Sequence, residues 1–146
     1  MITPTPITRE EIRATAALIR PYIRTTPIIE IDGHDLGVAL DRVTLKLEYL
    51  QHAGSFKSRG AFTNLLMHDV PPAGVAAASG GNHGAAVAFA AHRLNKPAHI
   101  FVPTVASQAK IDQIKSYGAE LVVGGDRYAD ALETCNTWIA ADRKST

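Results

Sequence analysis

Short apolar runs alternate with helical spans along most of this 146-residue sequence, and that alternation limits the folds open to it. We expect strands at 27–31, 43–50, 75–79, 98–102 and 120–123, and helices at 58–67, 82–94, 107–117 and 128–141. Helical spans of this length are typical of crossovers between parallel strands, so the strand near Val43 should begin four strand–helix units. The sequence therefore predicts an α/β fold with an open, mostly parallel sheet and helices on both faces.

Helix-terminal signals support this arrangement. Thr8 and Glu11 have the spacing of a capping box, which predicts a helix that Pro21 then ends. Ser107 is a good N-cap for a later helix, and Gly118 is a typical stop signal for it.

Composition excludes several classes of function. The formal net charge is +1 with both signs mixed along the chain, so we expect neither a nucleic-acid partner nor a membrane partner. The single cysteine forms no internal disulfide, and the six histidines lack metal-ligand spacing, so no metal is expected. Residues 1–6 have no positive start followed by an apolar run, which indicates no signal peptide. We expect a cytoplasmic protein.

A lysine between a strand and a helix is the strongest chemical feature. Residues 54–60 read Gly-Ser-Phe-Lys-Ser-Arg-Gly and open the helix at 58–67. The positive end of a helix and burial beside Phe56 would both disfavour the ammonium form of Lys57, which frees its amine as a nucleophile. Such an amine can form a Schiff base with a carbonyl cofactor. The alternative is an ordinary solvated lysine.

A second turn carries the other candidate site. Residues 80–84 read Gly-Gly-Asn-His-Gly, between a short apolar strand and a helix of small residues. Glycines allow a ligand close to the backbone, and unpaired N–H groups at a helix start hold anions such as carboxylates. The turn matches neither the dinucleotide fingerprint nor the P-loop, and it could be only a packing device. Both turns fall at the carboxyl ends of strands, so they can face one cleft.

Together the two turns resemble the fold-type II pyridoxal-phosphate-dependent enzymes, most closely their threonine/serine dehydratase branch. The residues that carry the resemblance are Glu48, Leu50, Gln51, Gly54, Ser55, Phe56, Lys57, Arg59, Gly60 and Ala61, followed by Ser79, Gly81, Asn82 and His83. A looser likeness runs through 24–27 and 110–118. The resemblance implies the small domain of the tryptophan-synthase-β-like fold, with pyridoxal 5'-phosphate as the cofactor.

The resemblance also implies roles for individual residues. Lys57 would bind the cofactor covalently and remove the Cα proton of the substrate. Phe56 would pack near the cofactor ring or fill the helix–sheet interface, and Asn82 would bond the phenolic oxygen of the cofactor. The residues that would bind the substrate carboxylate are Ser79, Gly80, Gly81, Asn82 and His83. His83 could instead stabilise the turn, and Arg59 is either an anion clamp or, more often, a structural ion-pair partner. Tyr49, Gln51 and His52 are expected to surround the lysine turn without acting as catalysts.

The implied reaction is the elimination of water and ammonia from L-threonine or L-serine to give a 2-oxo acid. The substrate partner would thus be a small amino acid. Racemising members of the family carry serine at the position of Gly80, and glycine has no side chain to exchange a proton, so elimination is favoured. Serine racemase and other β-elimination or β-replacement members remain alternatives.

The resemblance further implies a division of the chain. Residues 1–50 would belong to a larger domain whose remainder is absent, and 51–146 would form the small domain that carries Lys57. We expect the chain alone to be folded but to lack dehydratase turnover. We also expect a homo-oligomer, or else a poorly soluble monomer, because a bare apolar surface favours self-association. The alternatives are an inactive folded or interaction module and a nucleotide-binding domain with a coincidental lysine.

Overall fold

The computed structural model describes residues 6–142, which contain five α-helices, five strands and short 3-10 turns. The α-helices are α1 (Arg9–Ile19), α2 (Lys57–Met67), α3 (Asn82–Arg93), α4 (Gln108–Ser116) and α5 (Tyr128–Asp142). The strands are β1 (Ile28–Asp32), β2 (Arg42–Lys46), β3 (Val75–Ala78), β4 (Ala98–Val102) and β5 (Glu120–Val123). Residues 1–5 and 143–146 lie outside the described residues. The expectation of no signal peptide and the outer ends of the two expected domains fall on these residues.

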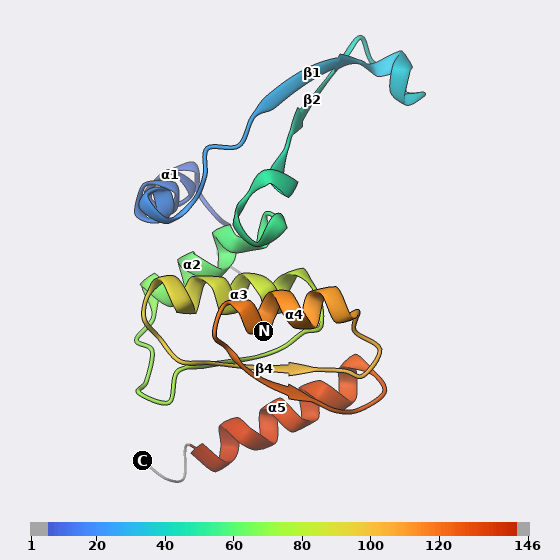
Figure 1. Cartoon of the computed structure of the whole chain (residues 1–146). Coiled ribbons are helices and arrows are strands. Elements are labelled where there is room, and N and C mark those ends of the chain that lie inside the picture. Colours follow the sequence, from blue (N-terminus) through green and yellow to red (C-terminus); the bar gives the residue numbers. More distant parts are fainter. Residues whose placement is uncertain (1–5, 143–146) are drawn as a thin grey trace.

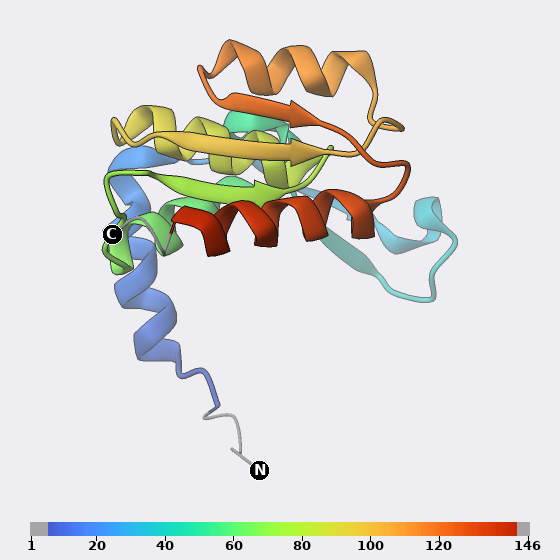
Figure 2. The ribbon, with the colours of Figure 1, turned by 90° about the horizontal axis from the view of Figure 1, so that it is seen from below.

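Three parallel strands form the centre of the body, in the order β3–β4–β5. α3 and α4 pack on one face of this sheet, and α5 packs on the other (Figure 1). α2 packs on α3 and makes a further layer on that side. Figure 2 shows the three strands side by side, with α5 running alongside them next to β3. The prediction of an α/β fold with a parallel sheet and helices on both faces is confirmed.

The strand near Val43 is not part of this sheet, and that expectation is wrong. β2 pairs antiparallel with β1, with Ile28 opposite Lys46 and Asp32 opposite Arg42. The two strands are joined by a short connection that turns at Gly37, whose φ is 71°. A connection that short can join only antiparallel neighbours, because a parallel pair needs a long crossover. The resulting hairpin extends away from the sheet (Figure 1).

α3 is built of small residues because it lies between the sheet and α2. Its buried side chains include Ala85, Ala86, Ala88, Ala90 and Ala91. A Cβ on Gly84 would lie 2.3 Å from the carbonyl oxygen of Ser79, so only glycine lets the helix start so close to the end of β3. Phe62 of α2 packs into the same core and is fully buried, which contributes about 2–3 kcal/mol.

A chain of aromatic contacts connects the N-terminal segment to the body. The ring of Tyr22 stacks on Phe62 at 5.2 Å between centroids, and Phe62 meets Phe89 edge-on at 6.0 Å. Phe89 in turn meets Tyr117 at 5.3 Å. These four side chains form one continuous row of contacts. The row begins in the segment that follows α1, passes through α2 and α3, and ends at the C-terminal end of α4.

α1 begins as the sequence predicts. The backbone N–H of Thr8 donates to Glu11 Oε2 at 2.7 Å, and the N–H of Glu11 donates to Thr8 Oγ1 at 3.2 Å, which completes the capping box. α1 packs on α2 but buries only Ile19, and Figure 2 shows the rest of the helix extending from the body. Within residues 6–142, no helix is long and apolar enough to cross a membrane.

A two-bonded ion pair fixes the hairpin to α2. Arg59 donates from Nε to Glu48 Oε2 at 2.8 Å and from Nη2 to Glu48 Oε1 at 2.7 Å. Thr26 Oγ1 donates to the same Oε1 at 2.5 Å, and the Glu48 side chain is only 17 % exposed. The bonds from Arg59 hold the pKa of Glu48 at about 2, against an ordinary 4.5, despite the opposing effect of burial. Arg59 is therefore a structural ion-pair partner, as the sequence favoured.

We expect Glu48→Gln to lower the free energy of unfolding at pH 7 by about 2–3 kcal/mol, because the guanidinium and hydroxyl donors lose their charged acceptor. The matched control is Glu30→Gln, whose partner Arg42 lies 3.0 Å away in the exposed hairpin with side chains 69 % and 55 % exposed. That substitution should cost less than about 0.5 kcal/mol. Denaturant unfolding measures both, and equal losses would contradict a special contribution from the enclosed pair.

The difference in stability between the original chain and Glu48→Gln should depend on pH. The pKa of Glu48 is lower in the folded chain than its ordinary 4.5, so its stabilisation is fully present above that pH. Stabilisation is then lost as pH falls towards about 2, where the folded carboxylate also binds a proton. The original chain and Glu48→Gln should therefore converge in stability over this range. A difference that stays constant down to pH 2 would show that the charge of Glu48 is not its source.

Candidate active site

Lys57 is the first residue of α2 and follows a tight, left-handed turn. Ala53 and Gly54 both have positive φ, at 57° and 74°. Glycine adopts that conformation freely, whereas the buried Ala53 is held in it against a cost of about 1 kcal/mol. The backbone N–H of Lys57 donates to Ser55 Oγ at 3.4 Å, and Ser58 Oγ donates to the carbonyl of His52 at 2.5 Å. The turn thus presents Lys57 on a backbone fixed from both sides.

Gln51 fastens this turn to the segment after α1. Its side-chain amide accepts from the N–H of Arg24 and donates to the carbonyl of Arg24, both at 2.8 Å. Its oxygen also accepts from the N–H of His52 at 3.1 Å. Because Gln51 is buried, losing these bonds would leave unpaired polar groups away from water. The expectation that Gln51 surrounds the lysine turn agrees with this placement.

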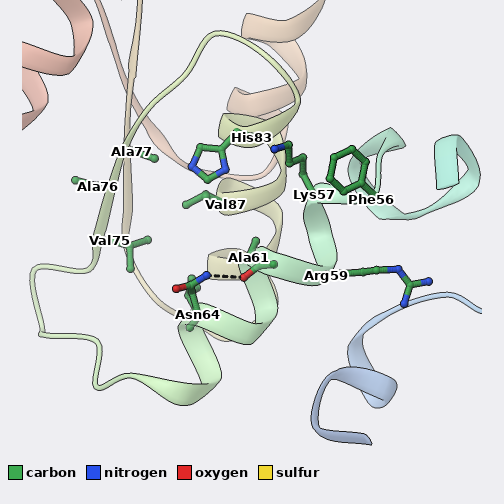
Figure 3. A pocket seen from close by; sticks show the side chains of 12 residues that line it. Phe56, Lys57, Arg59, Ala61, Asn64, Val75, Ala76, Ala77, His83 and Val87 are labelled. Atoms are coloured by element: carbon green, nitrogen blue, oxygen red, sulfur yellow. Dashed lines mark hydrogen bonds between the residues drawn. The ribbon is translucent and has the colours of Figure 1, made fainter. Parts of the chain in front are cut away.

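A cavity of about 590 Å³ lies between α2, β3 and the first turn of α3. The residues at its mouth and along its walls include Phe56, Lys57, Ala61, Leu65, Ala77 and His83. Figure 3 shows the Lys57 side chain lying between the Phe56 ring and the His83 imidazole, whereas Arg59 points away from it. Lys57 Nζ is 5.0 Å from the centroid of the Phe56 ring.

Burial of Lys57 beside Phe56 was expected, and the structure corrects this. Lys57 is exposed, and Phe56 is 57 % exposed, because the start of α2 lies at the rim of the cavity. Among the described residues, Lys57 Nζ makes no hydrogen bond or ion pair, and it lies beside the Phe56 ring. The amine is therefore accessible to a ligand that enters the cavity.

The 79–83 turn is rigid at its start and open at its end. Ser79 donates its N–H to the carbonyl of Phe101 at 2.9 Å, and Ser79 Oγ accepts from the N–H of Gly81 at 3.2 Å. Gly81 is the N-cap residue of α3 and supplies no capping side chain, and Asn82 and His83 are exposed. The first N–H groups of α3 are therefore available to an anion.

The structure brings together some of the residues that were predicted to share one cleft. His83 lines the cavity with Lys57 and Phe56. The remaining predicted residues, Ser79, Gly80, Gly81 and Asn82, form the turn beside the cavity rather than its walls.

The pKa of His83 is lowered by partial burial and by the charge of Lys57. The cavity wall removes enough water from the imidazole to lower the pKa of His83, and the positive charge of Lys57 lowers it further. His83 is thus held mainly in its neutral form near pH 7, which suits a hydrogen-bonding group better than a second cation. The described residues contain no group of three or more side chains that could hold a metal ion.

Sequence reasoning missed the apolar wall of the cavity. Ala61 and Leu65 follow Lys57 at steps of four residues, so all three lie on one face of α2. Val75 and Ala77 of β3 supply the opposite wall. The four-residue spacing was a usable signal, whereas the opposing strand residues depend on how α2 packs.

We expect Lys57→Met to raise the pKa of His83, because the substitution removes the neighbouring positive charge and leaves the loss of water unchanged. An NMR titration of the imidazole measures this shift. Lys96→Met, beyond the far end of α3, is the control and should leave His83 unchanged. Identical titrations of the original chain and Lys57→Met would place the two side chains too far apart to interact.

Comparisons with known proteins agree on one family. The model of the family described as pyridoxal-phosphate dependent enzyme matches residues 19–146. A phenylserine dehydratase of Ralstonia pickettii is 42 % identical over 109 residues, which are 73 % of this chain and 33 % of that protein. A catabolic L-threonine dehydratase of Staphylococcus aureus (strain USA300) is 39 % identical over 120 residues, 81 % of this chain and 35 % of that protein.

A solved structure shows the same likeness in three dimensions. Maize serine racemase matches with a TM-score of 0.79 and 33 % identity, over 88 % of this chain and 39 % of that one. The chain thus spans about a third of the length of the curated relatives it matches.

Proposed function

The chain belongs to the family of pyridoxal-phosphate-dependent enzymes, and from that premise we propose that it carries the cofactor-binding and substrate-carboxylate residues of a hydroxy amino acid dehydratase. The proposed reaction removes water and ammonia from a substrate such as L-serine or L-threonine and leaves a 2-oxo acid. The observation that carries the proposal is the accessible Lys57 amine, which faces His83 beside the uncapped start of α3.

The residues present fit the reactive end of pyridoxal phosphate. Lys57 offers an amine that is engaged by no other polar group of the described chain, as attachment to the cofactor carbonyl requires. Phe56 offers an exposed ring next to it, and Asn82 offers an amide from the neighbouring turn. We assign these three residues to cofactor binding. When bound, pyridoxal phosphate accepts the negative charge that develops at the substrate Cα.

The start of α3 is proposed to bind the substrate carboxylate. Its free N–H groups and the positive helix end favour an anion, and Gly81 lets that anion approach the backbone. We assign this role to the turn residues Ser79, Gly80, Gly81, Asn82 and His83. His83, held mainly neutral, can donate a hydrogen bond to the substrate without competing with Lys57 as a cation.

Lys57 is proposed to move the proton. When its amine is free, Lys57 would take the proton from the substrate Cα from its place at the rim of the cavity. The apolar wall made by Ala61, Leu65 and Ala77 would limit water around the reacting carbon.

Racemisation is the second candidate, because a serine racemase is among the structural relatives. A racemase needs an acid or base on the second face of the substrate carbon, and the family resemblance implies a serine at the position of Gly80 in racemising members. Gly80 offers no group of that kind. Elimination is therefore favoured, in keeping with the two dehydratases among the sequence relatives.

The organisation of the whole protein forms part of the proposal. We infer that residues 1–50 belong with a larger domain and that 51–146 form the small domain. The hairpin supports this inference, because a two-stranded sheet projecting from the body is only marginally stable without a partner. The active protein is proposed to be a cytoplasmic homo-oligomer.

Borohydride reduction in the presence of pyridoxal phosphate tests the cofactor role of Lys57. We expect most of the fixed cofactor on Lys57 and little on the other five lysines of the sequence, because among the lysines of residues 6–142 only Lys57 lines the cavity. Peptide mapping gives the distribution, and Lys57→Met should abolish the main labelled peptide. Exposed Lys96 and Lys115 serve as internal controls for surface reaction. A label spread over the lysines according to exposure would defeat the assignment.

A further inference from the structure

We propose that Gly80 and Ala106 form a closed steric contact that determines which side chains the 79–83 turn can carry, with Ala106 as the residue that positions the turn. The proposal rests on the proposed function for its catalytic meaning, because the turn is the candidate carboxylate site. Its structural part depends only on the packing between the turn and the loop after β4.

The space next to Gly80 is already filled. A Cβ at this position would lie 2.6 Å from the Cβ of Ala106, closer than real Cβ atoms approach one another. It would also meet Val102 Cγ1 at 3.1 Å and Pro103 Cδ at 3.3 Å. Gly80 is therefore required by packing, whatever the turn binds, and any side chain here must displace either the turn or the loop.

The loop cannot retreat easily from such a side chain. The carbonyl of Gly125 accepts from Thr104 twice, from the N–H at 2.9 Å and from Oγ1 at 3.1 Å. Ala106 itself donates its N–H to the carbonyl of Pro103 at 3.0 Å, which closes a turn behind it. Val102 is fully buried in the sheet. These contacts hold the Ala106 methyl in place.

The turn cannot retreat easily either. Ser79 is bonded to Phe101 of β4, and the start of α3 presses on Ser79 so closely that Gly84 has no room for a side chain. An added methyl at position 80 would therefore push on a turn that is held at Ser79 and followed by the closely packed Gly84. Since His83 follows three residues later, we expect the movement to change the distance between His83 and Lys57.

This contact has a consequence for reaction type. A serine placed at position 80 alone would direct its Cβ into Ala106 rather than into free space. Two features thus keep a second acid or base out of this turn: Gly80 has no side chain, and Ala106 occupies the space that a side chain would need. Gly80→Ser should be accommodated only when Ala106→Gly opens the space.

A double-mutant cycle tests the contact in the 146-residue chain without cofactor. In the original background, Gly80→Ala should lower Tm by about 5 °C, the cost of overpacking. In the Ala106→Gly background the same substitution should lower Tm by roughly half as much or less, because the closest obstruction is gone and only the contacts with Val102 and Pro103 remain. The titration of His83 should shift in Gly80→Ala and return towards its original position in the double variant.

Gly81→Ala is the matched control, because it lies in the same turn, has φ −133° and would place its Cβ in open space. It should leave Tm within about 2 °C of the original. If Gly80→Ala fails to fold, a folded Gly80→Ala/Ala106→Gly variant still supports the contact. Equal Tm losses from Gly80→Ala in both backgrounds, or an unchanged His83 titration in Gly80→Ala, would overturn it. Neither readout uses pyridoxal phosphate, so this outcome is independent of whether Lys57 binds the cofactor.

Discussion

The ion pair between Glu48 and Arg59 is the contact on which the geometry of the lysine turn most depends. It ties the end of the hairpin to the second residue after Lys57, and Thr26 adds a third donor to the same carboxylate. Exposed ion pairs stabilise proteins little, but this one is mostly enclosed and both oxygens of its carboxylate accept hydrogen bonds. Gln51 bridges to Arg24, so the N-terminal segment is fastened at two points just before the turn, and Arg59 anchors the chain just after it.

The packing of α2 and α3 explains how the short turn before Lys57 can hold this side chain in a fixed place. The small residues of α3 let the sheet, α3 and α2 pack closely. The aromatic chain from Tyr22 to Tyr117 joins α2 and α3 to the segment after α1 and to the end of α4. A close-packed interior does not yield easily, so the distance between the starts of α2 and α3 is set by the core. The candidate site consists of those two helix starts. Its chemistry therefore depends on packing that none of the site residues supply.

Much of the fold could be predicted because it depends on local signals. The strand and helix bounds from β3 to α5 match the expectations within about two residues, since apolar runs, caps and Gly118 define them. The partner of β2 could not be predicted, because it depends on the turn at Gly37 and not on the strand itself. Exposure of Lys57 and the contact of Gly80 with Ala106 arise from elements distant in sequence, and no local pattern encodes them. The chemical roles of Lys57, Phe56 and the 79–83 turn stay predictions.

Amide hydrogen exchange on the original chain and Glu48→Gln tests most directly whether the ion pair holds the lysine turn. Loss of the pair should speed exchange at residues 51–60, where the turn is fixed, and leave the parallel strands β3, β4 and β5 as protected as before. The Glu30→Gln variant, which breaks an exposed pair of the same type, should leave both regions unchanged. Unchanged protection of 51–60 in Glu48→Gln would contradict the central role of this contact, and so would an equal loss of protection throughout the sheet.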